Sequence, residues 1–131
     1  ILELTNRYLG VKIEKKEAEE PTLNAADQRL LKEITETIET HMIDSDFNVT
    51  TLQEILGIGG KQLYRKLKAM TGKTPVEYIR ELRMNKAAMM LKEGKFSVSE
   101  VMYTVGFSNN SYFSKCFSKA FGMTPTEYMK S

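Results

Sequence analysis

A duplicated segment is the feature of this 131-residue chain that most restricts its fold. Residues 72–78 read GKTPVEY and residues 122–128 read GMTPTEY, fifty positions later, so five of the seven positions are identical. A glycine-containing turn precedes each copy, at residues 57–59 and 106–108, and an apolar stripe at helical spacing follows each turn. The stripes are Leu63, Leu67 and Met70 in the first copy and Phe113, Phe117 and Ala120 in the second. The chain therefore carries the same helix-turn-helix unit twice.

Apolar residues elsewhere also recur at helical spacing, and no segment sustains the alternation that is typical of a strand. A first helix is predicted from Ala25 to His41, with the apolar stripe Leu30, Ile34, Ile38 and Met42. Ser, Thr or Asn caps and terminal glycines predict further helices over residues 50–56, 61–71, 74–93, 97–105, 109–121 and 124–130. The predicted fold class is all-α. It consists of two helix-turn-helix subdomains joined by a long linker helix, a homeodomain-like pair, preceded by an extra N-terminal helix.

The chain divides into five predicted segments. Residues 1–23 are an acidic linker or the end of a preceding domain, and residues 24–46 contain the N-terminal helix that leads into the rest. The first helix-turn-helix covers residues 47–72, the linker helix residues 73–94 and the second helix-turn-helix residues 95–131. Because the chain starts at Ile1 and not at Met, we expect it to be part of a longer protein with sensor or anchor segments upstream.

The charge of the chain is distributed unevenly. The formal net charge is +2, but residues 1–46 hold 6 Lys/Arg and 11 Asp/Glu, whereas residues 47–131 hold 13 Lys/Arg and 6 Glu. The two parts therefore carry −5 and +7. A basic domain behind an acidic leader is typical of nucleic-acid binding, although a basic surface that only interacts with solvent has the same composition.

Several function classes lack the residues that they require. The chain has one cysteine, Cys116, and one histidine, His41, so no disulfide, zinc cluster or catalytic histidine constellation is expected. No phosphate-binding glycine loop or catalytic triad is present, and we expect no enzyme activity in this segment, no metal and no cofactor. No apolar run is long enough for a membrane span and no secretory signal is present. A cytoplasmic location is expected, and a membrane anchor in upstream segments stays open.

The faces opposite the two apolar stripes are polar, basic and free of long acidic side chains. They suit the DNA major groove, which admits one helix and presents hydrogen-bond donors and acceptors on its base edges. The candidate base-contacting residues are Lys61, Tyr64 and Arg65 in the first unit and Asn110, Ser111, Ser114 and Lys115 in the second. The candidate DNA-backbone contacts are Gln62, Lys68, Lys73, Thr74, Asn109, Ser118 and Lys119.

One polar face alone would carry little information, because every amphipathic helix exposes one. Two such faces, each after the same kind of turn, favour DNA. The predicted linker helix would span about 30 Å at 1.5 Å per residue. Successive major grooves on one side of DNA lie roughly 34 Å apart. A connector of this length could place two reading helices in adjacent grooves.

Other conspicuous side chains are predicted to have packing or capping roles. Cys116, Met89, Met90 and Tyr103 lie at core spacing, and Phe107 and Tyr112 are expected to brace the second turn. Glu77 and Glu127 occupy the first turn of their helices, where a carboxylate suits the helix dipole.

Three segments carry a resemblance to a known family: Leu63–Lys68, Val105–Lys115 and Phe121–Tyr128. Over about residues 47–129 the chain resembles an AraC/XylS-type DNA-binding domain. The resemblance implies two helix-turn-helix subdomains that bind adjacent major grooves of promoter DNA. The family's base-facing positions fall on the candidate base-contacting residues given above.

Residues 26–31 and 62–69 are similar to the output domains of hybrid two-component regulators, in which a sensor kinase and a receiver precede this domain. The implied partners are double-stranded promoter DNA, RNA polymerase, the upstream receiver and sensor domains, and a second copy of the full-length protein. The alternative is a helical protein-interaction module with only non-specific DNA affinity.

The chain departs from the family pattern at three positions. Gln53 and Met102 stand where the first helix of each unit usually has a small alanine, and Gly59 stands where a serine usually opens the first reading helix. We therefore expect a different fit between the helices, and a looser entry into the first reading helix.

Overall fold

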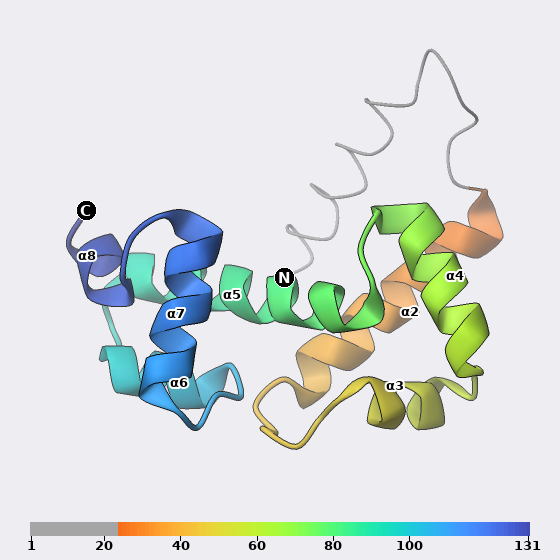
Figure 1. The fold of residues 1–131 in the computed structure, drawn as a ribbon, viewed down its shortest axis with the longest axis horizontal. Helices are drawn as coiled ribbons and strands as arrows, with labels where there is room; N and C mark the ends of the chain where they lie inside the picture. Colours follow the sequence, from red (N-terminus) through yellow and green to blue (C-terminus); the bar gives the residue numbers. More distant parts are fainter. Residues whose placement is uncertain (1–23) are drawn as a thin grey trace, which may run out of the picture. The chain divides into compact units, whose positions relative to one another are not determined.

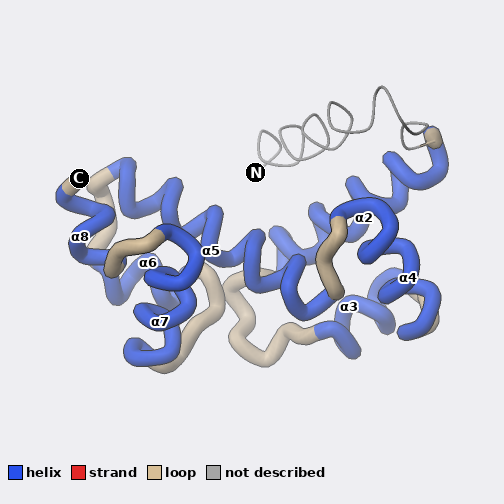
Figure 2. The backbone as a smooth tube through the Cα atoms, turned by 45° about the horizontal axis from the view of Figure 1, so that its top comes forward, coloured by secondary structure: helices blue, strands red, loops and turns tan. Residues whose placement is uncertain are grey.

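The computed structural model describes residues 24–131, and these residues fold into helices and connecting turns (Figure 1). No strand occurs in this part of the chain (Figure 2). The all-α prediction is confirmed. The helices are α2 (Ala25–His41), α3 (Val49–Leu56), α4 (Gly60–Thr71), α5 (Pro75–Glu93), α6 (Val98–Thr104), α7 (Asn110–Phe121) and α8 (Pro125–Lys130).

The helix ends follow from local sequence signals. Ser97 caps α6 and forms the predicted capping box with Glu100, because each side chain bonds the backbone N–H of the other residue at 3.1 and 2.8 Å. Glycines with positive φ end α4 and α7: Gly72 and Gly122 both have φ 76°. The duplicated segment therefore builds the same corner twice, as the repeat requires.

The two copies also share a second capping box, at the start of the helix that follows each corner. Thr74 and Glu77 exchange hydrogen bonds of 2.9 and 3.2 Å, and Thr124 and Glu127 exchange bonds of 2.9 and 3.1 Å. The bond from the threonine backbone N–H lowers the pKa of both carboxyl groups from the usual 4.5, and the threonine hydroxyl adds to this.

Replacing both glutamates by glutamine is expected to change how stability depends on pH. A carboxyl group with a lowered folded-state pKa stabilises the fold above its unfolded value of 4.5, and this contribution is lost as the pH falls through the lower folded value. The Glu77→Gln/Glu127→Gln variant should therefore melt below the wild type at neutral pH, and the difference should vanish in acid. Thermal melting across this pH range measures it. A difference that does not change with pH would contradict the assignment.

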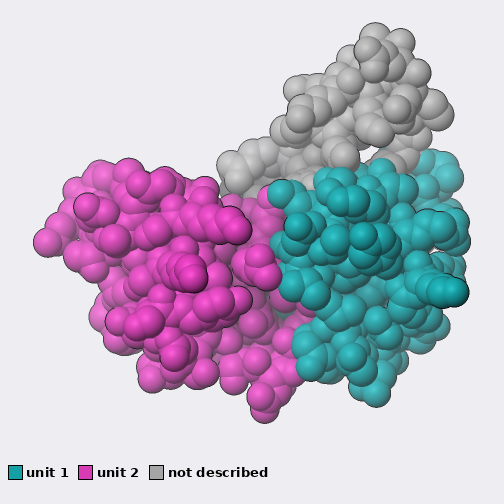
Figure 3. Space-filling view, viewed as in Figure 1, with its two compact units in different colours: residues 1–39, 48–78 teal, residues 40–47, 79–131 magenta. Residues whose placement is uncertain are grey.

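The described residues belong to two compact units, which Figure 3 colours separately. Unit 1 comprises residues 1–39 and 48–78, of which the structure describes those from 24 onward, and unit 2 comprises residues 40–47 and 79–131. The sequence-based division into five segments remains a prediction. Each unit contains one turn-connected helix pair, α3 and α4 in unit 1 and α6 and α7 in unit 2.

The core of unit 1 is formed by the buried faces of α2, α3 and α4, together with Tyr78 at the start of α5. Its fully buried apolar side chains are Leu31, Ile34, Ile38, Leu52, Leu63, Leu67, Met70 and Tyr78. The hydroxyl group of the buried Thr35 donates to the Leu31 carbonyl at 2.8 Å and lies 2.8 Å from the Tyr78 hydroxyl. Because the single proton of Thr35 is used, the Tyr78 hydroxyl donates to it. The predicted stripe of α2 is confirmed at Ile34, Ile38 and Met42, but Leu30 is half-buried and Leu31 takes the core position.

The core of unit 2 contains a cluster of aromatic rings beside its buried aliphatic side chains. Phe113 and Phe117 are fully buried, and their rings form a chain of contacts with Phe107, Phe121 and Tyr128 at centroid distances of 4.7–6.1 Å. The rings link α7 to the turn before it and to α8. Phe107 also lies 5.6 Å from Tyr112, so the predicted bracing of the second turn is present.

The segment that follows α2 is held in unit 2 by a half-buried arginine. Nη2 of Arg83, on α5, donates to the backbone carbonyls of Asp44 and Phe47 at 3.1 and 3.4 Å. Burial lowers the pKa of Arg83 from its usual value, and the nearby Asp44 carboxylate opposes this shift. The Phe47 ring stacks on His41 at 5.5 Å. Gly106 faces the same segment, with a left-handed φ of 87°.

Three packing predictions were wrong. Ala120 is exposed, because α7 ends one residue later and Phe121 packs on Phe117 at 4.7 Å in its place. Tyr103 is 59% exposed, because the short helix α6 buries Val101 and Met102 and leaves the next position facing solvent. Met89 is 39% exposed, whereas its neighbour Met90 is buried. The predicted linker over residues 1–23 lies outside the described residues.

Candidate nucleic-acid interface

Helix α4 presents the predicted reading face of unit 1. Its buried side is Leu63, Leu67 and Met70, and its first turns expose Lys61, Tyr64 and Arg65. The helix contains no acidic residue. Lys68 continues the exposed face, and its Nζ donates to the Gly72 carbonyl at 3.3 Å. The three predicted base-contacting residues of unit 1 therefore share one solvent-facing, cationic surface.

Helix α7 presents the corresponding face of unit 2. Asn110, Ser111 and Lys115 are exposed and Ser114 is half-buried, opposite the buried Phe113 and Phe117. This helix also lacks acidic residues. Its reading face is built from shorter side chains than that of α4, which would allow a closer approach to base edges.

The predicted DNA-backbone contacts flank these two faces. Gln62, Asn109 and Lys119 are exposed, and Lys73, Thr74 and Ser118 are half-buried. The Oδ1 atom of Asn109 accepts from the Tyr112 backbone N–H at 2.8 Å, which leaves its amide group as a donor. The Thr74 hydroxyl oxygen accepts from the Glu77 backbone N–H at 3.2 Å, within the capping box described above.

The two reading helices begin differently. Asn109 caps α7 with its side chain, whereas Gly59, the N-cap residue of α4, has no side chain to do so. The turn before α7 is also one residue longer: Asn109 follows Gly106 by three positions, and Gly59 follows Gly57 by two. Gly59 therefore leaves the first reading helix without a side-chain cap, and the looser entry expected from it stays a prediction.

Restoring a cap at Gly59 is expected to stabilise the chain. The backbone of Gly59 has φ −72° and ψ 154°, which serine adopts readily, and a Cβ there would meet nothing within 4 Å. Gly59→Ser should raise the free energy of unfolding by about 0.5–1 kcal/mol, through the cap bond and the lost freedom of glycine in the unfolded chain. Urea denaturation measures this change.

The matched control is Gly57→Ser, two residues earlier. That position has equal space but a φ of 65°, so the same substitution should destabilise the chain there. Equal effects at both positions would contradict a role for the cap.

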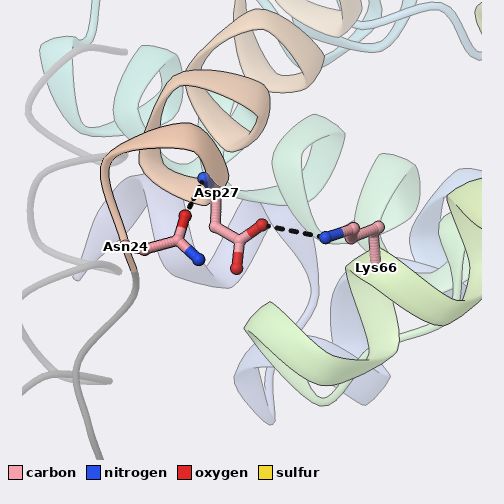
Figure 4. Close-up of polar contacts among 3 residues, drawn as sticks. All are labelled: Asn24, Asp27 and Lys66. Carbon is pink, nitrogen blue, oxygen red and sulfur yellow. Dashed lines mark hydrogen bonds and ion pairs between the residues drawn. The ribbon is translucent and has the colours of Figure 1, made fainter.

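Two features beside α4 were not predicted as part of a site. Lys66 is the α4 cation on the side toward α2, and its Nζ lies 3.1 Å from Oδ1 of Asp27, in the first turn of α2 (Figure 4). Asn24 caps the same turn, since its Oδ1 accepts from the Asp27 backbone N–H at 2.8 Å (Figure 4). A partly exposed pair of this kind stabilises by at most about 1 kcal/mol. The second feature is Gln53, whose side chain lies over Gly60.

Residues 24–131 bring together no group of three or more metal-binding side chains. No helix among these residues has the length and hydropathy that a membrane span requires.

Comparison with known proteins identifies the family. The helix-turn-helix domain profile matches residues 52–131, which is more than half of the chain. The chain belongs to the AraC-type helix-turn-helix family. A solved AraC-type transcriptional regulator from Chromobacterium violaceum is 28% identical, with a TM-score of 0.69 over 82% of this chain and 95% of that one. AraC-type membership makes the chain a DNA-binding domain of a transcriptional regulator, as the resemblance implied.

Two further relatives of this AraC-type domain are a two-component response regulator and a histidine kinase. The C-terminal domain of the response regulator yesN from Fusobacterium nucleatum is 29% identical, with a TM-score of 0.70 over 77% of this chain and 98% of that one. Histidine kinase P4 from Formosa agariphila is 39% identical over 109 residues, 83% of this chain. The chain spans 8% of that kinase, and 34% and 32% of the next two curated relatives.

Proposed function

We propose that this domain binds promoter DNA sequence-specifically by inserting α4 and α7 into adjacent major grooves. The observation that carries the proposal is the duplication of one surface. Each unit exposes a helix without acidic residues, preceded by a turn and a packed first helix. In helix-turn-helix proteins the second helix lies in the major groove, and its N-terminal residues contact base edges.

The contact residues follow from side-chain chemistry. Arg65 is suited to bind guanine O6 and N7 with two hydrogen bonds, and Asn110 to pair with adenine N6 and N7. Lys61, Tyr64, Ser111, Ser114 and Lys115 complete the proposed base contacts. The proposed phosphate contacts are Gln62, Lys68, Lys73, Thr74, Asn109, Ser118 and Lys119.

The length of α5 supports the use of two grooves. The helix has 19 residues, which corresponds to about 28 Å at 1.5 Å per residue. Major grooves repeat about every 34 Å on one side of the duplex. We infer that α5 connects two half-site readers whose half-sites lie one helical turn apart.

The full-length protein is, on this proposal, a hybrid two-component regulator that works in the cytoplasm. The similarity of 83% of the chain to a segment of a histidine kinase, and of 77% of it to the C-terminal domain of a response regulator, supports an upstream sensor kinase and receiver. RNA polymerase and a second copy of the full-length protein are the further partners, as expected of a promoter-bound regulator.

Selection of binding sites from randomised double-stranded DNA by the 131-residue chain tests the proposal. At near-physiological salt we expect a bipartite site with half-sites about 10 base pairs apart. Binding without enrichment, which disappears as the salt concentration rises, would leave only non-specific phosphate attraction. That result would favour a protein-interaction module over a sequence reader.

A further inference from the structure

Gln53 lies beside the reading helix of unit 1 and outside the contact residues proposed above. It belongs to α3 and is half-buried. Its carboxamide lies over Gly60, the first residue of α4, where a Cβ would be 3.1 Å from Nε2 and 3.5 Å from Oε1. The next residue is Lys61, the first of the proposed base contacts. The carboxamide therefore lies at the end of α4 that carries the reading residues.

The polar atoms of this carboxamide are open to a ligand as far as the described residues are concerned. The backbone carbonyl of Gln53 accepts from the Ile58 N–H at 3.2 Å, but within residues 24–131 its side chain has no hydrogen-bond partner. A glutamine amide offers two donors and one acceptor. Packing against Gly60 restrains the side chain, so a ligand would meet amide donors that are already positioned.

Gln53 and Gly60 form a matched pair. The long side chain of Gln53 fits against the start of α4 because Gly60 has no Cβ to displace it. The corresponding residue of unit 2 is Met102, which is 3% exposed and has no polar group to offer. The arrangement is therefore confined to unit 1, the unit whose reading helix lacks a side-chain cap.

We propose that Gln53 is an additional DNA-binding residue, whose amide donates to a phosphate oxygen at the edge of the groove that α4 reads. This inference rests on the proposed function. A phosphate is the expected acceptor because the first helix of a helix-turn-helix crosses the DNA backbone while the second enters the groove. The contact fixes the register of α4 on DNA. As a neutral donor, Gln53 adds a hydrogen bond without releasing a counterion.

The test uses Gln53→Ala and Gln53→Glu with the site selected by the wild type. Gln53→Ala should bind about tenfold more weakly, as expected for a lost bond to a charged acceptor, with an unchanged dependence on salt. Gln53→Glu should bind more weakly still, because a carboxylate repels the phosphate. Gln28→Glu, an equal charge change on the exposed side of α2, should bind like the wild type. Wild-type affinity in Gln53→Ala would overturn the inference, as would a loss confined to one base position.

A second variant separates DNA contact from a structural role. Gly60→Ala should displace the carboxamide and weaken binding in the wild type, but should have no further effect on binding in the Gln53→Ala background. An equal effect in both backgrounds would overturn the inference. Absence of any sequence preference in the wild type would instead refute the proposed function, so the two failures are distinguishable.

Discussion

Replacing Gly106 by alanine is expected to lower the free energy of unfolding by about 2–5 kcal/mol. The left-handed φ of 87° is strained for any residue with a Cβ. The new methyl group would also overlap the backbone carbonyl oxygen of Met42 and lie 3.0 Å from Cζ of Arg83. Neither neighbour can move freely, because Arg83 also holds the Asp44 and Phe47 carbonyls. Thermal and urea denaturation of the variant measure the loss.

Gly122→Ala is the matched control for this prediction. Gly122 has a similar φ of 76°, but a Cβ there would meet nothing within 4 Å. It should cost only the backbone strain, about 1–2 kcal/mol. If the two variants were equally stable, the close approach of Met42 and Arg83 to Gly106 would be wrong.

Removing one basic, proposed base-contacting side chain from each unit is expected to weaken specific DNA binding by about 2–6 kcal/mol. Each good bidentate contact with a base contributes about 1–3 kcal/mol of discrimination. Arg65→Ala/Lys115→Ala removes one such candidate from α4 and one from α7, and both side chains are exposed, so the fold should be retained. Fluorescence anisotropy with the selected duplex measures the affinity.

The charge-matched control is Arg29→Ala/Lys95→Ala, which removes the same two kinds of residue from exposed positions outside α4 and α7. It should lose only the small, sequence-independent attraction of two distant cations. Equal losses in the two double variants would show that charge alone is being measured, which would contradict base contacts by Arg65 and Lys115.

Much of this fold could be predicted because its signals are local. The cap and capping box of Ser97, the bounds of α2, and the Gly72 and Gly122 corners depend on residues within one or two turns of each other. The buried face of α4 followed from spacing alone. For the same reason the exposed faces of α4 and α7 could be proposed from sequence, and their side chains lie at the surface.

Contacts between distant residues could not be predicted in this way. No local pattern places Arg83 against residues 44 and 47, or Gln53 against Gly60, because each contact depends on how helices pack. The error at Ala120 has a similar origin: spacing predicts a buried face, but the end of a helix and a neighbouring Phe121 decide which residue fills it. Base contacts depend in addition on the sequence and geometry of the bound DNA, about which the amino-acid sequence gives no direct information.

The most direct test of the account repeats the DNA selection with Arg65→Ala and Lys115→Ala as separate variants. If the chain has two reading helices, each variant should reduce the base preference at one position of the selected site. The two positions should lie in opposite half-sites, and each variant should leave the other half-site unchanged. Both variants could instead reduce the base preference in the same half-site, or neither could change the selected site. Either result would contradict the central claim that α4 and α7 each recognise one half-site.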